Sequence, residues 1–148
     1  MIKISYPQKK PLIKTSEGKD LVYCLVRKRW MQLTPEEWVR QNFLLYLIEV
    51  LSYPGSLIGV ERQFEFLDMK KRFDIVVHDR RSAPFMIIEC KEMNQRLSDA
   101  VLSQVLRYNV QLRARYIVVT NGSYCAAFEQ IGTAINAIDE LPLFTQPL

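Results

Sequence analysis

Three charged side chains on two strand-like segments have residue types and a spacing that suit metal-assisted hydrolysis. Asp74 lies in the segment RFDIVV, and Glu89 and Lys91 lie in the segment IIECK. Strand side chains alternate between faces, so Glu89 and Lys91 point the same way. If the two segments pair through the turn at residues 79–84, the Asp74 carboxylate lies beside that of Glu89. Two carboxylates and an ammonium group would then meet.

Such a pair of carboxylates favours a hard cation. The two anions repel each other, and oxygen ligands prefer Mg²⁺ or Mn²⁺ to zinc or copper. A bound metal polarises a phosphoryl oxygen, while a lysine orients the attacking water or stabilises the developing charge. We therefore expect Asp74 and Glu89 as metal ligands and Lys91 as a catalytic residue. The alternative is an exposed acid–base pair worth less than about 1 kcal/mol.

A helix is predicted ahead of these segments, from about Pro35 to Leu51. Thr34 offers an N-cap oxygen, Pro35 suits the first helical position and Glu37 completes a capping box. Proline and glycine in the sequence SYPG at residues 52–55 end the helix.

Two glutamates of this helix compete for a role in the site. Glu37 has a structural role in the capping box, whereas Glu36 shares the apolar face of Val39 and Phe43. A carboxylate on that face needs a metal or a cation as partner. We therefore favour Glu36 as the acid that the helix supplies.

Period-two patterns and turn residues predict three successive strands. They cover residues 57–67, 73–78 and 85–91, with turns at 70–72 and 79–84. Short connections imply an antiparallel meander.

A second helix and a central strand follow the meander. Ser98 can cap a helix that runs to about Arg113, and residues 115–120 form an apolar run typical of a buried strand. Residues 124–130 are expected to add an edge strand, and residues 135–148 a short segment packed on the surface.

The second helix carries an amide on its apolar stripe. This stripe is expected to face the sheet, where a buried amide needs partners. The alternative is a glutamine at the helix margin that bonds a backbone carbonyl. The stripe consists of Val101, Gln104, Val105, Tyr108 and Leu112.

The chain length and the lack of a visible repeat or linker indicate one α/β domain over residues 1–148. We expect an N-terminal arm with short strands at 1–30, a core at about 31–122, and an edge strand with a tail at 123–148. Residues 1–20 lack a period and suggest the arm, and residues 21–33 form two short strands or one bent strand. Trp30, preceded by Arg27, Lys28 and Arg29, is either a stacking platform for single strands or a core residue.

Composition narrows the function classes further. A net charge of +4 and a pI near 9.0 suit a polyanionic partner. No apolar run is long enough for a membrane span, and the basic N-terminus lacks the apolar segment of an export signal, so we expect a cytoplasmic protein without a membrane anchor. Three cysteines and a single histidine do not form a zinc site and are expected to be buried or structural.

The order helix, three strands, helix, strand with D…E-x-K resembles the PD-(D/E)xK nuclease superfamily. More narrowly, LTPEEWVRQ, KRFDIVVHD, FMIIECK and SQVLRYN resemble the N-terminal nuclease domain of type I restriction enzyme R subunits and its smaller stand-alone relatives, over about residues 30–122. The resemblance implies a restriction-endonuclease-like fold with a central mixed β-sheet (an α-β-β-β-α-β core) flanked by helices. Phe73 replaces the proline of the superfamily name, at a position without chemistry.

The resemblance also implies roles for further residues. It makes Gln104 part of the catalytic site and Tyr108 a supporting or DNA-contacting residue. We expect Glu37, Arg40 and Arg72 to support the site or to bind DNA, with Arg72 as the best candidate among the exposed basic side chains for a phosphate contact.

We therefore expect a Mg²⁺-dependent or Mn²⁺-dependent nuclease that hydrolyses DNA, without the helicase motor of R subunits, for which 148 residues leave no room. The expected partners are DNA, other restriction-modification subunits and a second copy of the chain, because the first helix has a broad apolar surface. Two alternatives are a catalytically silent DNA-binding or assembly module and a nuclease for branched DNA or RNA.

Overall fold

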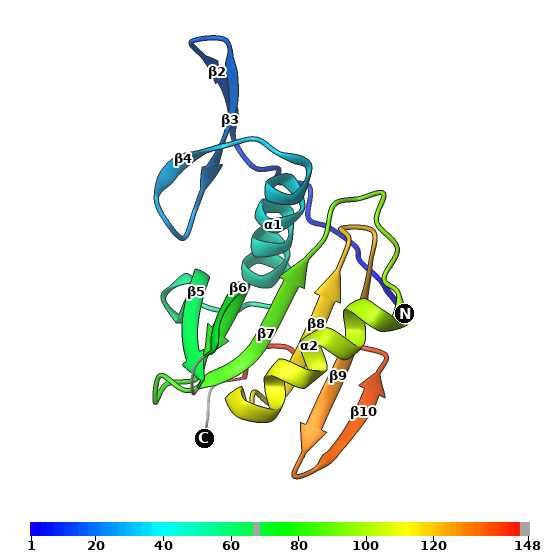
Figure 1. Cartoon of the computed structure of the whole chain (residues 1–148). Coiled ribbons are helices and arrows are strands. Elements are labelled where there is room, and N and C mark those ends of the chain that lie inside the picture. The colour runs from blue at the N-terminus through cyan, green and yellow to red at the C-terminus, as the bar shows by residue number, and fades with distance from the viewer. Residues whose placement is uncertain (67–68, 146–148) are drawn as a thin grey trace.

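The computed structural model describes residues 1–66 and 69–145 and contains a mixed seven-stranded sheet at its centre (Figure 1). The strand order is β1-β9-β8-β7-β6-β5, and β10 also pairs with β9. Strands β7 and β8 are parallel and the other pairs are antiparallel. The strands are β1 (Ile2–Lys3), β5 (Ile58–Phe66), β6 (Met69–His78), β7 (Pro84–Cys90), β8 (Tyr116–Thr120), β9 (Tyr124–Ile131) and β10 (Ala134–Ile138).

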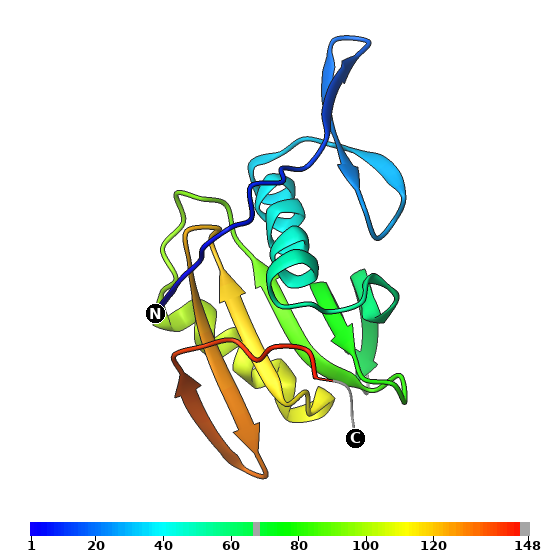
Figure 2. The ribbon, with the colours of Figure 1, turned by 180° about the vertical axis from the view of Figure 1, so that it is seen from behind.

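Two helices cover opposite faces of this sheet, as the front and rear views show (Figures 1 and 2). Helix α1 (Pro35–Leu45) continues as a π-helical segment η1 (Tyr46–Val50), and a 3₁₀ turn η2 (Gly55–Leu57) leads into β5. Helix α2 (Asp99–Leu112) connects β7 to β8, as the parallel pairing of those strands requires. The predicted helices and the antiparallel meander β5-β6-β7 are confirmed.

Each face of the sheet has its own hydrophobic core. Val39, Phe43 and Leu47 of the first helix pack with Ile75 and Ile88 on one face. Val105 of α2 packs with Phe73, Val76 and Ile87 on the other. The α1 side chains that belong to this core are thus covered within the chain, and the expected contact with a second copy stays a prediction.

The N-terminal residues differ from the predicted arm. Strand β1 pairs with β9, and a separate three-stranded antiparallel sheet contains β2 (Ile13–Ser16), β3 (Lys19–Cys24) and β4 (Arg29–Gln32). The hairpin β2–β3 turns at Glu17 and Gly18, both with positive φ. Backbone pairing therefore organises a segment whose side chains show no period.

Three predicted boundaries also change. Residues 70–72, predicted as a turn, belong to β6, and the segment predicted to pack on the surface at 135–148 begins with a strand of the sheet, β10 (Ala134–Ile138). The predicted edge strand, found as β9, is not at the sheet edge because β1 and β10 pair with it. The predicted strand end at Leu67 and the last residues of the tail, 146–148, lie outside the described residues.

Candidate active site

Asp74 and Glu89 lie side by side on β6 and β7. The register places Ile75 opposite Ile88, which brings Asp74 next to Glu89. The Cys90 backbone N–H donates to Asp74 Oδ2 over 2.8 Å. The antiparallel pairing that the sequence predicted therefore does bring the two carboxylates together.

Glu89 is a buried carboxylate with an incompletely paired oxygen. Its side chain is 7% exposed, and Lys71 Nζ lies 3.2 Å from Oε1. That contact meets an ion-pair distance but not hydrogen-bond geometry, so Oε1 has no hydrogen-bond partner among the described residues. Burial, and secondly the charge of Asp74, raise the pKa of Glu89 to about 8.

The donor set fits a hard divalent cation. Two adjacent carboxylates, one with a buried oxygen that lacks a hydrogen-bond partner, are the kind of ligands that Mg²⁺ uses when it retains several waters. Within residues 1–66 and 69–145, no group of three or more His, Cys, Asp or Glu side chains is arranged to hold a metal. The described side chains that could hold a metal ion are therefore Asp74 and Glu89.

Lys91 directly follows the last residue of β7, two residues after Glu89. Its backbone N–H donates to the Thr120 carbonyl over 2.7 Å, which joins the end of β7 to the end of β8. Burial raises the pKa of Glu36, Asp74 raises it further, and Arg40 and Lys91 oppose the shift. Lys91 therefore lies within electrostatic range of Glu36, on the side of the site that α1 closes.

The two glutamates of α1 exchange their expected environments. Glu37 is buried and Glu36 is half exposed, with 6% and 49% of the side chain accessible. Thr34 caps the helix by accepting from the Glu37 N–H, but the Glu37 carboxylate pairs with Arg27 and Arg40 rather than closing the capping box. The first helical turn lies at the rim of the sheet, so sharing a stripe with Val39 does not bury Glu36.

A relay of ion pairs connects Asp74 to the three-stranded sheet. Arg40 Nη2 donates to Asp74 Oδ1 over 2.6 Å, and its Nη1 donates to Glu37, which also accepts from Arg27. Glu61 of β5 joins this group through Arg27, at 3.2 Å. Its positive φ of 53° at the position beside Asp74 marks a local distortion of the strand.

Sequence reasoning missed Arg27, Glu61 and Lys71. Lys71 belonged to a basic run that was interpreted as a turn, and only the extension of β6 to Met69 brings it to Glu89. The period-two pattern of β5 places Glu61 on a polar face but carries no sign of its contact with α1. Arg40, expected as a supporting residue, contacts Asp74 directly.

Of the residues predicted on α2 and β6, Tyr108 is packed near the site, whereas Gln104 and Arg72 are exposed. Tyr108 packs against Phe73 with ring centroids 6.4 Å apart, and Lys71 Nζ lies 5.2 Å from the Tyr108 ring. Gln104 is exposed, which corrects the expectation that its amide faces the sheet, since the stripe of α2 is narrower than predicted. Arg72 is exposed on β6, opposite Gln63.

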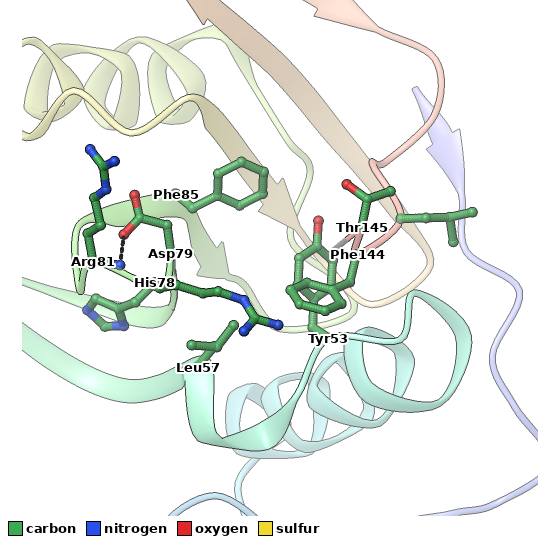
Figure 3. Close-up of a pocket in the computed structure, with 10 residues that line it drawn as sticks. Tyr53, Leu57, His78, Asp79, Arg81, Phe85, Phe144 and Thr145 are labelled. Carbon is green, nitrogen blue, oxygen red and sulfur yellow. Dashed lines mark hydrogen bonds between the residues drawn. The ribbon is translucent and has the colours of Figure 1, made fainter. Parts of the chain in front are cut away.

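Two hollows flank the ends of the sheet. A cleft of about 600 Å³ lies beside the site and is lined by Arg27, Met31, Gln32, Thr34, Pro35, Glu36, Glu37, Arg40, Glu61 and Glu92. An apolar pocket of about 300 Å³ lies beyond the opposite end of β6. Figure 3 shows Tyr53, Phe85 and Phe144 around it, with His78 from the end of β6 and Asp79 from the β6–β7 connection.

All three cysteines are buried and free, as predicted. No helix in the described part of the chain is long and apolar enough to cross a membrane.

The sequence matches one known protein family. A family model described as "Type I restriction enzyme R protein N terminus (HSDR_N)" matches residues 35–142. A sequence comparison with curated proteins gives no match.

Two solved structures are similar to this chain, and the first of them supports the fold. A fragment of a "putative HsdR subunit of a type I restriction enzyme" from Vibrio vulnificus YJ016 superposes with a TM-score of 0.56 at 17% identity, over 74% of this chain and 24% of that one. This chain thus spans about a quarter of that structure. A "putative nuclease belonging to DUF820" from Anabaena variabilis ATCC 29413 covers 90% of this chain and 80% of its own, with 15% identity and a TM-score of 0.48. The restriction-endonuclease-like fold is confirmed.

Proposed function

Because the chain belongs to the family of type I restriction enzyme R protein N termini, we propose that this nuclease-like domain hydrolyses DNA phosphodiester bonds with Mg²⁺ or Mn²⁺. One observation carries the proposal: Glu89, buried beside Asp74, has an oxygen without a hydrogen-bond partner in the described structure. A buried carboxylate with a raised pKa is costly for the fold and is typical of functional sites.

Each side chain of the site has a distinct part in this proposal. Asp74 and Glu89 would hold the metal ion, and the ion would polarise the phosphoryl oxygen and lower the pKa of a bound water. Lys91, at the rim, would orient the attacking water or stabilise the developing negative charge. Arg40 positions Asp74 through its 2.6 Å contact. Glu36, half exposed at the mouth of the cleft, is placed to meet solvent or substrate.

Other predicted roles rest on position alone. Tyr108 would hold Lys71 near Glu89 through its ring, and Gln104 and Arg72 are exposed and would contact DNA. We also propose a restriction-modification context, in which the domain works with other subunits in the cytoplasm.

A catalytically silent module is the second candidate, and one observation favours it. Arg40 already pairs with Asp74 and Lys71 with Glu89, so the fold can hold the two carboxyl groups together without a metal ion.

A metal-dependent cleavage assay separates the two candidates. Supercoiled, linear, single-stranded and branched DNA, with RNA as a further substrate, are incubated with Mg²⁺, Mn²⁺ or EDTA. We expect cleavage with either metal, and a loss of at least about 1,000-fold in Lys91→Ala and in Asp74→Asn.

Lys70→Ala serves as the matched control, because Lys70 is exposed and pairs only with Glu65 at 3.7 Å among the described residues. It should cleave as the wild type does, and circular dichroism should show that each variant folds. Absence of cleavage on every substrate with both metals would contradict the enzyme proposal, as would full activity in Lys91→Ala. Preferential cleavage of branched DNA or RNA would redirect the substrate class.

A further inference from the structure

The positive charge of this chain is concentrated in its first 33 residues. They contain eight basic and two acidic side chains, a formal net charge of +6. The other 115 residues contain 12 basic and 14 acidic side chains, a net charge of −2, so the +4 of the whole chain comes from the N-terminal part. The family match begins at residue 35 and does not account for this part.

Residues 13–32 of this part, with five of its eight basic side chains, contain the sheet β2-β3-β4, which projects from the core beside the start of α1 (Figure 1). One face of this sheet is packed, because Val22 and Cys24 are fully buried. Strand alternation places Lys14, Lys19, Tyr23 and Trp30 on the outer face. Lys14 Nζ lies 4.3 Å from the Trp30 ring centroid, so the ring is already covered by a cation and favours a phosphate contact over base stacking.

Four cations of this sheet lack carboxylate partners. Lys14, Lys19, Lys28 and Arg29 are exposed, and none forms an ion pair with any described residue. Arg27 differs, since Glu37 and Glu61 neutralise it. Glu17 and Asp20 are the only acidic residues within residues 13–32, where five basic residues outnumber them, so this sheet has a net positive charge that attracts a polyanion.

The opposite wall of the neighbouring cleft is acidic. On the side formed by the core, four glutamates outnumber the single cation Arg40, while Arg27, Met31 and Gln32 line the side formed by the three-stranded sheet. The four glutamates are Glu36, Glu37, Glu61 and Glu92. The loop that joins β3 to β4 and carries Lys28 turns toward β5 (Figure 1). A phosphodiester that approaches the carboxylates is repelled by the core wall, and cations across the cleft offset that repulsion.

Arg27 fixes the basic sheet relative to the candidate active site. Its backbone N–H and its Nε both donate to Cys24 Sγ over 3.3 Å, and its guanidinium reaches Glu37. Glu37 pairs with Arg40, which holds Asp74. A phosphate bound to this sheet therefore has a defined position with respect to Asp74.

We propose that the sheet β2-β3-β4 binds the sugar-phosphate backbone of DNA and presents it to the cleft. Lys28 and Arg29 contact phosphates beside the cleft, and Lys14 and Lys19 extend the contact along the outer face. The contact is sequence-independent, because phosphates carry no base information. This inference rests on the proposed nuclease function for its choice of DNA.

Salt-dependent binding tests the proposal without catalysis. The full chain is titrated against a labelled DNA duplex by fluorescence anisotropy in EDTA, between about 50 and 200 mM salt. The variant is Lys28→Asn with Arg29→Gln, since asparagine tolerates the positive φ of 55° at position 28. We expect a Kd at least about tenfold higher, and a slope of log K against log salt that is shallower by about 2.

Arg80→Gln with Arg81→Gln is the matched control. It removes the same charge from the exposed turn at the opposite end of β6, beside the apolar pocket. This variant should lose less than about threefold in affinity if distance from the cleft matters. An equal loss in both variants would show that net charge alone governs binding and would overturn the proposal.

Two further outcomes separate this proposal from the nuclease proposal. Normal DNA binding without cleavage at any metal concentration would contradict the nuclease function while it leaves the DNA-binding sheet intact. Cleavage with wild-type affinity in the Lys28→Asn, Arg29→Gln variant would overturn the DNA-binding sheet and leave the nuclease function intact. An unchanged unfolding midpoint in urea confirms that this variant remains folded.

Discussion

The two ends of the segment over which β6 pairs with β7 are buried by opposite chemistry. At one end Asp74 and Glu89 are enclosed with Arg40 and Lys71, so charged groups balance one another with little water. At the other end the ring of Tyr53 packs against those of Phe144 and Phe85, with centroids 5.6 and 6.4 Å apart. The aromatic end gains stability from apolar area, whereas the charged end depends on protonation and on the pairing of every charge.

This difference predicts opposite responses to similar mutations. Making a buried side chain neutral should stabilise the charged end when the shape is kept, because a desolvated charge disappears. Removing the Tyr53 hydroxyl from the aromatic end should only destabilise it, because that hydroxyl donates to the Pro142 carbonyl. Three variants test this contrast.

The largest effect is expected from Arg40→Ala. Without the guanidinium, the carboxylates of Glu37 and Asp74 remain close together and lose their shared partner. Breaking a buried ion pair on one side costs about 3 to 5 kcal/mol. Urea unfolding at neutral pH measures the free energy of unfolding.

Arg115→Ala provides the comparison for Arg40→Ala. Arg115 pairs with Glu129 at 2.9 Å but is 58% exposed, so its loss should cost less than about 1 kcal/mol. Equal losses in the two variants would mean that the relay beside Asp74 behaves like a surface ion pair.

A smaller effect of the opposite sign is expected from Glu89→Gln. The pKa of Glu89 is about 8 in the folded protein and near 4.5 in the unfolded chain. Between these values the folded protein retains a proton that the unfolded chain releases, so the stability of the wild type falls as pH rises from about 4.5 to about 8. The glutamine variant lacks this fall and should be more stable than the wild type by on the order of 2 kcal/mol at pH 8 in EDTA.

Urea unfolding at intervals across that pH range measures the effect. Glu65→Gln is the control, because Glu65 is exposed and pairs with Lys70 on the β5–β6 hairpin. A wild-type stability that stays flat across the range, or a glutamine variant that is less stable at pH 8, would show that Glu89 is not held at a cost to the fold.

The smallest effect is expected from Tyr53→Phe at the aromatic end. Tyr53 is buried, and its hydroxyl donates to the Pro142 carbonyl over 2.8 Å. Loss of this hydrogen bond should cost about 1 kcal/mol and leave cleavage unchanged. Hydrogen exchange at the Phe144 amide, which donates to the Leu51 carbonyl, should report the loosened C-terminal segment.

Tyr124→Phe is the control for this end, since Tyr124 is 46% exposed and its hydroxyl has no hydrogen-bond partner in the described structure. Faster cleavage or a changed pH dependence in Tyr53→Phe would show that the two ends are coupled, contrary to the comparison.

Local patterns predicted the parts of the fold that local forces control. Thr34 and Ser98 are N-caps as expected, because a side-chain oxygen before a helix accepts from the free N–H groups of its first turn. The alternation in β6 and β7 predicted that Asp74 and Glu89 would be neighbours, since antiparallel pairing through a short turn leaves few registers.

The predictions from sequence were wrong for side chains whose burial depends on a segment distant in the chain. A helical wheel assigned Glu36 to the buried face, but the sheet rim and Arg27 decide that Glu37 is the buried acid. The stripe on α2 suggested an inward Gln104, yet the sheet beneath that helix covers Val105 and Asn109 and leaves Gln104 exposed. A periodic pattern gives the direction of a side chain around its helix but not how far the neighbouring surface extends.

The sequence by itself determined the order of the core elements, the pair Asp74 and Glu89, and the family resemblance, because these depend on spacing along the chain. Only the tertiary structure decided which cations meet the carboxylates. Arg27, Arg40 and Lys71 lie on three different elements, and ion pairs form wherever packing removes the alternative of water. The placement of the basic sheet beside the cleft has the same origin, since charge composition is readable in a sequence and its position in space depends on the fold.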